Sequence, residues 1–403
     1  MRTALVALLV VVVACGVFVA VQLTRRVPGA TFRATLTSSV VVPGTRPLLR
    51  WPAGAEAGIS VGGVGSFGTV GGDAPIPVGS VAKIMAAYVV LHDHPLAPNA
   101  QGPGIPITAA DVARYRSDLA QGDSVAAVAA GELLSERQAI QALLVPSGDN
   151  IAWLLAVWDA GSEPAFVAKM NATASGLGLT HTHYADVSGL SPQTVSTAAD
   201  QIKLAPLAMA VPALANTVRL TQVSLPVAGL VSNYDKLLGQ DGIIGIKTGS
   251  TPQARGCLVF AAQKKVAGQT ETFYGAVLGA KPAPGQGLIA AALAASRRLL
   301  VSAEAAVRPV TVLSPGTRAG RVDAPWLSSP VRATTARPVT LVGWPGLTAR
   351  LSVVPPGHLG KKVPAGTGAG RVVVALGAQK ATVDLTTTRA VPAPSLRWRL
   401  GRV

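Results

Sequence analysis

The sequence predicts an α+β fold in which helices cover a mostly antiparallel sheet, with a small all-β domain after it and a membrane anchor before it. Strand-like runs flank a long helical block, which favours a mixed sheet covered by helices. Valine- and threonine-rich runs between Pro/Gly turns fill the chain after residue 307. We therefore expect a signal anchor at residues 1–27, a Pro-rich linker at 28–54, a main domain at 55–306 and a β-rich domain at 307–403.

The N-terminus contains an unbroken, uncharged apolar run from Ala4 to Leu23, bordered by Arg2 and by Arg25-Arg26. Its length is that of a membrane-spanning helix. A cleaved signal peptide would have a shorter apolar core followed by a small-residue cleavage site. We predict a single-pass anchor in the cytoplasmic membrane with the rest of the chain outside it. Secretion after signal cleavage is the alternative.

Composition limits the classes of partner. The chain is 49% hydrophobic and 13% charged, which is typical of a compact globular protein. Its formal net charge of +16 favours an anionic environment, such as nucleic acid, a membrane surface or a cell-wall polymer. Nucleic acid is the weakest of these, because the arginines are scattered and only 4% of residues are aromatic. Cys257, in a strand-like run, is predicted to be a small core residue.

The main domain is predicted to open with a hairpin and to close with a helix. Between them lies a helical block, in which a capping box at Ser135–Gln138 starts a helix that runs to Leu144. After that block the apolar period changes to that of strands. The predicted elements are strands at Gly58–Val61, Ser66–Val70, Val218–Leu225, Gly245–Thr248, Cys257–Ala262 and Phe273–Leu278, and a helix at Gly287–Ala306.

The first candidate for chemistry is the pair Ser80 and Lys83, at the start of a predicted helix in the segment Pro75–His92. Two side chains three residues apart on a helix lie on one face and can touch. A serine becomes a nucleophile when a base takes its proton and positive potential stabilises its oxygen. An ordinary helix start is the alternative explanation for this pattern.

Two further motifs strengthen that candidate. Ser147-Gly148-Asp149-Asn150 lies in a tight corner between two predicted helices, and Lys247-Thr248-Gly249-Ser250 ends a predicted strand. Serine nucleophile, corner serine and strand Lys-Thr-Gly follow one another in that order. The set resembles the penicillin-binding proteins and serine β-lactamases, for which Ser-x-x-Lys and Lys-Thr-Gly are signature elements.

The resemblance is closest to the D-alanyl-D-alanine carboxypeptidases of the low-molecular-mass penicillin-binding protein type, and it covers roughly residues 55–306. It implies a β-lactamase/transpeptidase-like domain that removes the terminal D-alanine from peptidoglycan stem peptides. It also implies covalent inhibition by β-lactams and a reaction without a cofactor. A D,D-endopeptidase, a β-lactamase and a non-catalytic wall-binding protein are the alternatives.

The same resemblance implies a role for each motif residue. Ser80 would attack the carbonyl carbon, Lys83 would take its proton, and Ser147 would relay a proton to the leaving amine. Lys247 and Thr248 would bind the substrate carboxylate, and Gly249 would let the strand backbone approach. The backbone N–H groups of Ser80 and Ser250 would form the oxyanion hole.

The middle motif departs from the family pattern, which is Ser-x-Asn. Here Asp149 takes the third position and Asn150 follows it. Either Asp149 is accommodated by the neighbouring lysines or Asn150 points into the site, and helix capping would explain both residues equally well. The pairs His92-x-His94 and His181-x-His183 lack a completing cysteine or acidic cluster, so we predict no metal site.

Overall fold

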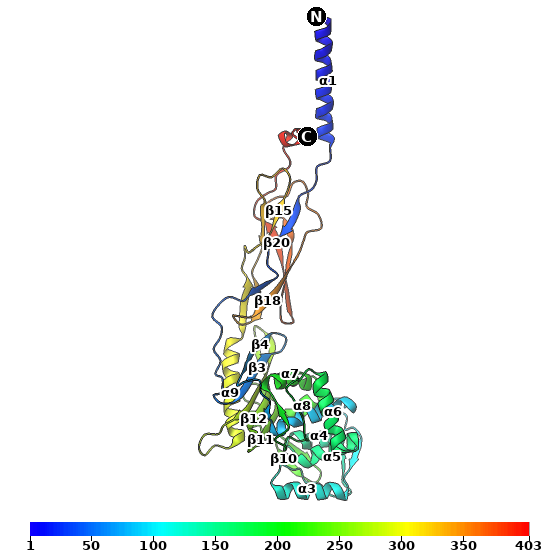
Figure 1. Cartoon of the computed structure of the whole chain (residues 1–403), viewed down its shortest axis with the longest axis vertical. Coiled ribbons are helices and arrows are strands. Elements are labelled where there is room, and N and C mark those ends of the chain that lie inside the picture. The colour runs from blue at the N-terminus through cyan, green and yellow to red at the C-terminus, as the bar shows by residue number, and fades with distance from the viewer. Residues whose placement is uncertain (403) are drawn as a thin grey trace. The chain divides into compact units, whose positions relative to one another are not determined.

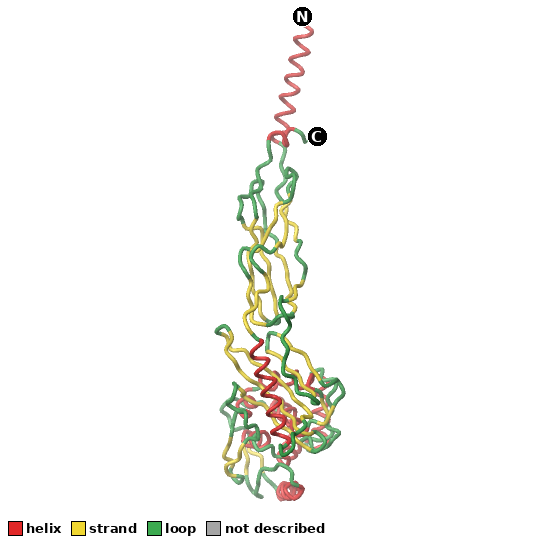
Figure 2. Tube along the Cα trace, turned by 90° about the vertical axis from the view of Figure 1, so that its left-hand side faces the viewer, coloured by secondary structure: helices red, strands yellow, loops and turns green. Residues whose placement is uncertain are grey.

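The computed structural model describes residues 1–402, which form two compact units (Figures 1 and 2). One unit is the continuous segment Pro47–Arg308. The other combines residues 1–46 with the chain from Pro309 onward.

The unit Pro47–Arg308 is built on a five-stranded antiparallel sheet. The predicted hairpin and the strands predicted at Gly245–Thr248, Cys257–Ala262 and Phe273–Leu278 belong to it, in the spatial order β11-β12-β13-β3-β4. β11 therefore lies at one edge of the sheet with only β12 beside it. The five strands are β3 (Glu56–Val61), β4 (Gly65–Val70), β11 (Ile243–Thr251), β12 (Arg255–Val266) and β13 (Gln269–Ala280).

Helices cover both faces of this sheet, as the α+β prediction requires. α9 packs along one face, while α7 and α8, backed by α2, pack on the other (Figure 1). The interior strand β12 is consequently buried on both faces between Gly256 and Ala262. The helices are α2 (Lys83–Asp93), α3 (Ala109–Gln121), α4 (Glu136–Leu144), α5 (Asp149–Ala160), α6 (Glu163–Gly176), α7 (Ala198–Met209), α8 (Pro212–Val218) and α9 (Leu288–Ala306).

Local sequence signals explain several helix starts. Ser135 and Gln138 form the predicted capping box at the start of α4, and the Ser162 side chain caps α6. The strand expected at Val218–Leu225 is partly wrong, because Pro212 starts α8 and that helix continues through Val218. Three short ribbons complete the unit: β5 (Ile76–Pro77) with β8 (Val195–Ser196), β6 (Gly104–Pro106) with β7 (Leu133–Ser135), and β9 (Gln222–Leu225) with β10 (Gly229–Ser232).

The second unit is a β-rich domain around a seven-stranded sheet in the order β1-β15-β16-β20-β19-β18-β2. A two-stranded ribbon of β14 and β17 contributes to the same apolar core. The strands are β1 (Thr31–Ala34), β2 (Ser39–Val41), β14 (Arg308–Leu313), β15 (Arg318–Asp323), β16 (Val331–Thr335), β17 (Val339–Gly343), β18 (Thr348–Val354), β19 (Gly368–Leu376) and β20 (Gln379–Thr387).

The linker predicted at residues 28–54 is corrected by this sheet. β1 pairs with β15 and β2 pairs with β18, so residues 31–41 are part of the β domain. Phe32 and Val40 pack against its core, and the two strands cover edges whose backbone groups would otherwise be unpaired. These strands are only four and three residues long. An alternation of apolar and polar residues cannot be recognised over so few positions among prolines and polar residues.

The predicted apolar segment forms the helix α1 (Arg2–Thr24). It is long and apolar enough to cross a membrane, and its 18-residue apolar window has a mean hydropathy of 3.2 with no buried residues. A short helix, α10 (Leu396–Leu400), lies near its end, where Arg402 donates to the carbonyl oxygen of Gln22 over 3.0 Å.

Candidate active site

Ser80 lies in a short 3-10 turn, η1 (Gly79–Ala82), that leads directly into α2 at Lys83. The sequence predicted the helix start but not the tighter turn. Residues three apart are eclipsed in a 3-10 turn, so the two side chains lie one above the other. Lys83 Nζ donates a hydrogen bond of 2.8 Å to Ser80 Oγ. The Ser80 side chain is partly exposed, and the Lys83 side chain is completely buried.

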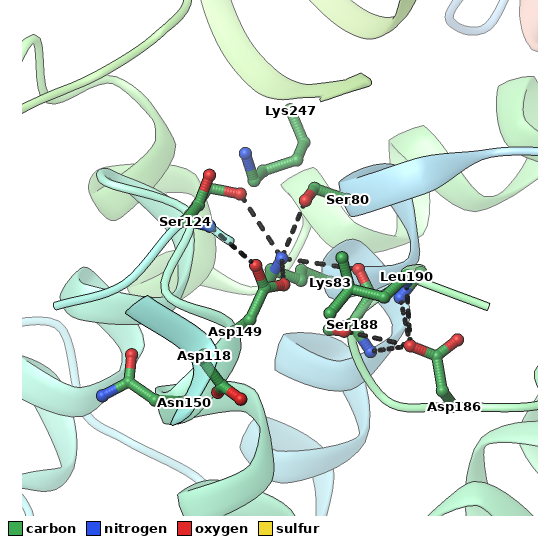
Figure 3. Close-up of polar contacts among 12 residues, drawn as sticks. Ser80, Lys83, Asp118, Ser124, Asp149, Asn150, Asp186, Ser188, Leu190 and Lys247 are labelled. Carbon is green, nitrogen blue, oxygen red and sulfur yellow. Dashed lines mark hydrogen bonds and ion pairs between the residues drawn. The ribbon is translucent and has the colours of Figure 1, made fainter. Parts of the chain in front are cut away.

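The Lys83 amine is the centre of a buried cluster (Figure 3). Besides Ser80 it contacts Asp149 Oδ1 at 2.6 Å and Ser147 Oγ at 3.4 Å. The carbonyl oxygen of Ser188 lies 3.4 Å from it. Residues from three separate parts of the helical block therefore converge on one amine.

Asp149, at the start of α5, forms an ion pair with Lys83 in which 2% of the acid's side chain is exposed. Its second oxygen, Oδ2, accepts a 3.1 Å hydrogen bond from the backbone N–H of Ser124. The neighbouring Asn150 does not face the cluster: its amide bonds in both directions to the backbone of Ala126, at 3.0 and 2.9 Å. Both amide atoms of Asn150 are therefore already used, and the structure does not bring this side chain to the Lys83 cluster. Of the two alternatives, Asp149 points inward.

Ser147 lies in the corner between α4 and α5, as the sequence predicted. Its backbone has φ of +66°, a conformation that is uncommon for a residue with a Cβ. The side chain is 3% exposed and its hydroxyl lies within reach of Lys83. A residue held in this backbone conformation costs about 1 kcal/mol or more in strain, and such strained residues concentrate at functional sites.

Lys247, Thr248 and Gly249 lie on the edge strand β11, next to η1. Lys247 is 2% exposed, and its amine points toward the Lys83 cluster (Figure 3). Burial, with a smaller contribution from the charge of Lys83, lowers the pKa of Lys247 to about 7. A lysine with that pKa changes charge near neutral pH, which is uncommon for an amine in a purely structural role.

Glycine is required where β11 meets η1. A Cβ on Gly249 would lie 2.6 Å from the carbonyl oxygen of Val78 and 3.1 Å from the backbone nitrogen of Ser80. Likewise, a Cβ on Gly79, whose φ is +56°, would lie 3.0 Å from the backbone nitrogen of Ser250. The absence of a Cβ at both glycines therefore lets the backbone of the Ser80 turn lie directly against β11 at Gly249 and Ser250.

The loop after Asp186 contributes to the site although none of the sequence motifs above includes it. Asp186 Oδ2 accepts hydrogen bonds from the backbone N–H groups of Ser188, Gly189 and Leu190, at 3.2, 2.9 and 2.9 Å. This holds the Ser188 carbonyl against Lys83 and packs Gly189 onto Gly79. An aspartate followed within three residues by Ser-Gly is a turn pattern that could have indicated the loop.

The remaining candidates have structural roles. Cys257 is fully buried in β12, as predicted, and burial raises the pKa of its thiol to about 12. His94 contacts Asp159 over 3.0 Å and His92 contacts Asp93 over 3.3 Å. Within residues 1–402, no group of three or more His, Cys, Asp or Glu side chains is arranged to hold a metal ion.

The cluster thus contains a serine hydroxyl next to an amine, a second hydroxyl, and a second amine beside an edge strand. A hydroxyl and an amine at 2.8 Å can exchange a proton, which is the requirement for a serine nucleophile. A cationic amine next to a free strand edge can bind an extended chain that ends in a carboxylate.

Comparison with known families gives a match over residues 71–281 to the model described as D-alanyl-D-alanine carboxypeptidase. The chain is 32% identical over 205 residues to a D-alanyl-D-alanine carboxypeptidase from a Streptomyces species, covering 46% of this chain and 68% of that protein. It is 33% identical over 195 residues to a D-alanyl-D-alanine carboxypeptidase of Mycobacterium tuberculosis, covering 47% and 62%. A D-alanyl-D-alanine endopeptidase of Pseudomonas aeruginosa is 33% identical over 133 residues, covering 33% and 39%.

The fold is similar to solved structures as well. The crystal structure of a Streptomyces DD-transpeptidase matches with a TM-score of 0.54 and 27% identity, covering 66% of this chain and 100% of that one. An evolved penicillin-binding protein homologue from Mycobacterium tuberculosis matches with the same TM-score and identity, covering 66% and 96%.

Proposed function

The chain belongs to the D-alanyl-D-alanine carboxypeptidase family of serine peptidases, and we propose that Ser80 is its nucleophile. The observation that carries this proposal is the 2.8 Å contact between Ser80 Oγ and a fully buried lysine amine. The substrate is a peptidoglycan stem peptide ending in D-alanyl-D-alanine, and the product is free D-alanine. β-Lactams would acylate the same serine.

In the acylation step, Ser80 Oγ bonds to the carbonyl carbon of the penultimate D-alanine while its proton passes to Lys83. The Lys83 amine must be neutral to accept that proton. Asp149 Oδ1, 2.6 Å away, and Ser147 Oγ, 3.4 Å away, hold this amine in place beside Ser80 Oγ.

The amide C–N bond then breaks, and the leaving D-alanine nitrogen takes a proton from Lys83 through the Ser147 hydroxyl. The backbone N–H groups of Ser80 and Ser250 lie where η1 and β11 meet and would stabilise the oxyanion. Water next attacks the acyl-serine ester, which releases the shortened peptide and returns the proton to Ser80.

Substrate would lie along the free edge of β11, with its terminal carboxylate at Lys247 and Thr248. The Lys247 pKa of about 7 means that the free enzyme carries this charge only in part at neutral pH. A bound carboxylate favours the charged amine, so substrate binding is coupled to proton uptake by Lys247.

Covalent labelling with a fluorescent penicillin tests the nucleophile. Wild-type protein should be labelled and the Ser80→Ala variant should not. Ser117→Ala, on the exposed surface of α3, is the matched control and should be labelled like wild type. Absence of labelling in the wild type, or equal labelling of Ser80→Ala, would contradict the proposal.

A second candidate activity is D,D-endopeptidase cleavage, which the Pseudomonas aeruginosa relative favours. The acyl-serine chemistry is the same, and only the leaving group differs. Release of D-alanine from a soluble pentapeptide, compared with cleavage of purified cross-linked dimers, separates the two activities. Faster cleavage of dimers would make endopeptidase the main activity.

We propose further that α1 anchors the protein in the cytoplasmic membrane with both units outside. The support is its apolar, unburied surface and the extracytoplasmic location of the family's substrate. The intact mass of the protein purified from the membrane fraction should include residues 1–27. A mature protein that starts after this segment and is released into the medium would favour signal cleavage instead.

A further inference from the structure

The net charge of the chain is confined to one of its two units. Residues 47–308 contain 17 of the 35 Lys and Arg residues and 17 of the 19 Asp and Glu residues, so this unit is formally neutral. The rest of the chain contains 18 basic and 2 acidic residues. The whole charge of +16 therefore belongs to the unit without the Ser80 site.

Three of these basic residues are in register on adjacent strands of the seven-stranded sheet. Arg33 on β1 is directly opposite Arg321 on β15, which in turn is directly opposite Arg332 on β16. Directly opposite residues point to the same side of a sheet. Their neighbours Val322 and Val331 are fully buried, so the three arginines, called here the arginine row, lie on the outer face.

Like charges directly opposite one another destabilise a sheet. Asp323 partly compensates the repulsion between these arginines, since its Oδ2 lies 3.1 Å from Arg321 and 3.7 Å from Arg33. Arg332 has no ion-pair partner within residues 1–402. Arg33 and Arg332 are exposed and Arg321 is partly exposed. A surface with one acid for three such cations gains free energy when an anion binds.

The surroundings of the row indicate a hydrated partner. The outward positions next to it include Thr31, Thr334 and a further exposed arginine, Arg318. No strongly exposed large apolar side chain lies on β1, β15 or β16. A surface that inserts into a bilayer combines cations with exposed Trp, Phe or Leu side chains. The row therefore favours a water-swollen anionic polymer over lipid.

We propose that the arginine row binds free carboxylates of the stem peptides in insoluble peptidoglycan and so holds the enzyme on its polymeric substrate. The inference rests on the proposed function for the identity of the polymer. Arginine suits this partner because its planar guanidinium donates two parallel hydrogen bonds to a carboxylate. Stem peptides repeat along each glycan strand, so several weak contacts add up at one surface.

Cosedimentation of the full chain with purified peptidoglycan, in detergent and on the Ser80→Ala background, tests the proposal. The triple variant Arg33→Gln, Arg321→Gln, Arg332→Gln should bind about tenfold more weakly. Asp323→Asn should bind more tightly, because it removes the carboxylate that pairs with Arg33 and Arg321. Binding should weaken with added salt, and this dependence should be smaller in the triple variant.

The matched control lowers the net charge equally at exposed residues outside the row: Lys361→Gln, Lys362→Gln, Arg397→Gln. It should bind nearly as well as the parent protein. Peptidoglycan whose carboxylates have been converted to amides should lose binding to the parent protein. Thermal unfolding of both triple variants checks that they are folded.

Equal binding by the row variant and its control would overturn the proposal. Stronger retention on a polyglycerol phosphate polymer or on anionic lipid vesicles than on peptidoglycan would overturn the choice of partner. Activity separates this inference from the proposed function, because the row variant with Ser80 intact should cleave a soluble pentapeptide at the wild-type rate. Failure of the wild type to cleave that peptide would refute the function instead.

Discussion

Replacing Asp149 with asparagine removes the anion that faces the Lys83 amine while keeping the shape of the side chain. The two groups are 2.6 Å apart, and their side chains are 2% and 0% exposed. Loss of one partner from a buried ion pair costs about 3 kcal/mol, because the remaining charge is left without compensation. In a domain of this size, this loss of unfolding free energy lowers Tm by about 6–12 °C.

The same substitution should slow acylation. Asp149 Oδ1 contacts the Lys83 amine at 2.6 Å, and that amine lies 2.8 Å from Ser80 Oγ. Without the carboxylate the amine is free to move away from Ser80. A misplacement of a catalytic group by about 1 Å costs about 100-fold in rate, so we expect acylation of Asp149→Asn to be about 100-fold slower than that of the wild type.

Thermal unfolding followed by circular dichroism and stopped-flow acylation by a fluorescent penicillin measure these two effects. Asp118→Asn is the control, since Asp118 is also buried but pairs with the partly exposed Arg114 and not with Lys83. It should lower Tm less and leave the acylation rate unchanged. An unchanged Tm and acylation rate in Asp149→Asn would refute the role given to the ion pair.

Three further substitutions test the rest of the site. Because the Lys247 pKa is about 7, below the ordinary 10.5, the free enzyme loses this charge as pH rises through 7. kcat/KM for a pentapeptide should therefore fall above pH 7 in the wild type, and Lys247→Arg should move this fall to higher pH. Gly249→Ala would put a Cβ 2.6 Å from the carbonyl oxygen of Val78, so penicillin acylation should slow at least about 100-fold. Asn150→Ala removes two buried hydrogen bonds to Ala126 and should cost about 2 kcal/mol of unfolding free energy, measured by urea denaturation, with KM unchanged.

Each of these tests has its own control. A pentapeptide with an amidated C-terminus lacks the carboxylate and should show no fall in kcat/KM above pH 7. Gly176→Ala, at a helix position with open space around its Cβ, should acylate at the wild-type rate. A raised KM in folded Asn150→Ala would mean that this side chain contacts substrate after all.

Local patterns determined much of this protein. The motif residues Ser80 and Lys83 are three apart, and either an α-helix or a 3-10 turn brings such side chains together. Ser135 and Ser162 mark helix starts because their hydroxyls satisfy free N–H groups wherever such a helix begins. An apolar run as long as Ala4–Leu23 has few structures available to it besides a helix.

Only the tertiary structure decided which polar side chains face the site and which short segments join a sheet. Asp149 and Asn150 are adjacent polar residues of similar size, and only the position of Lys83 and of the Ala126 backbone fixes which one turns inward. The segment 31–41 reads as a linker because its strands are very short, and it becomes part of a sheet only because β15 and β18 have open edges 280 or more residues away in the chain. Such pairings depend on long-range contacts, which are formed by the whole fold and leave little trace in the sequence around each strand.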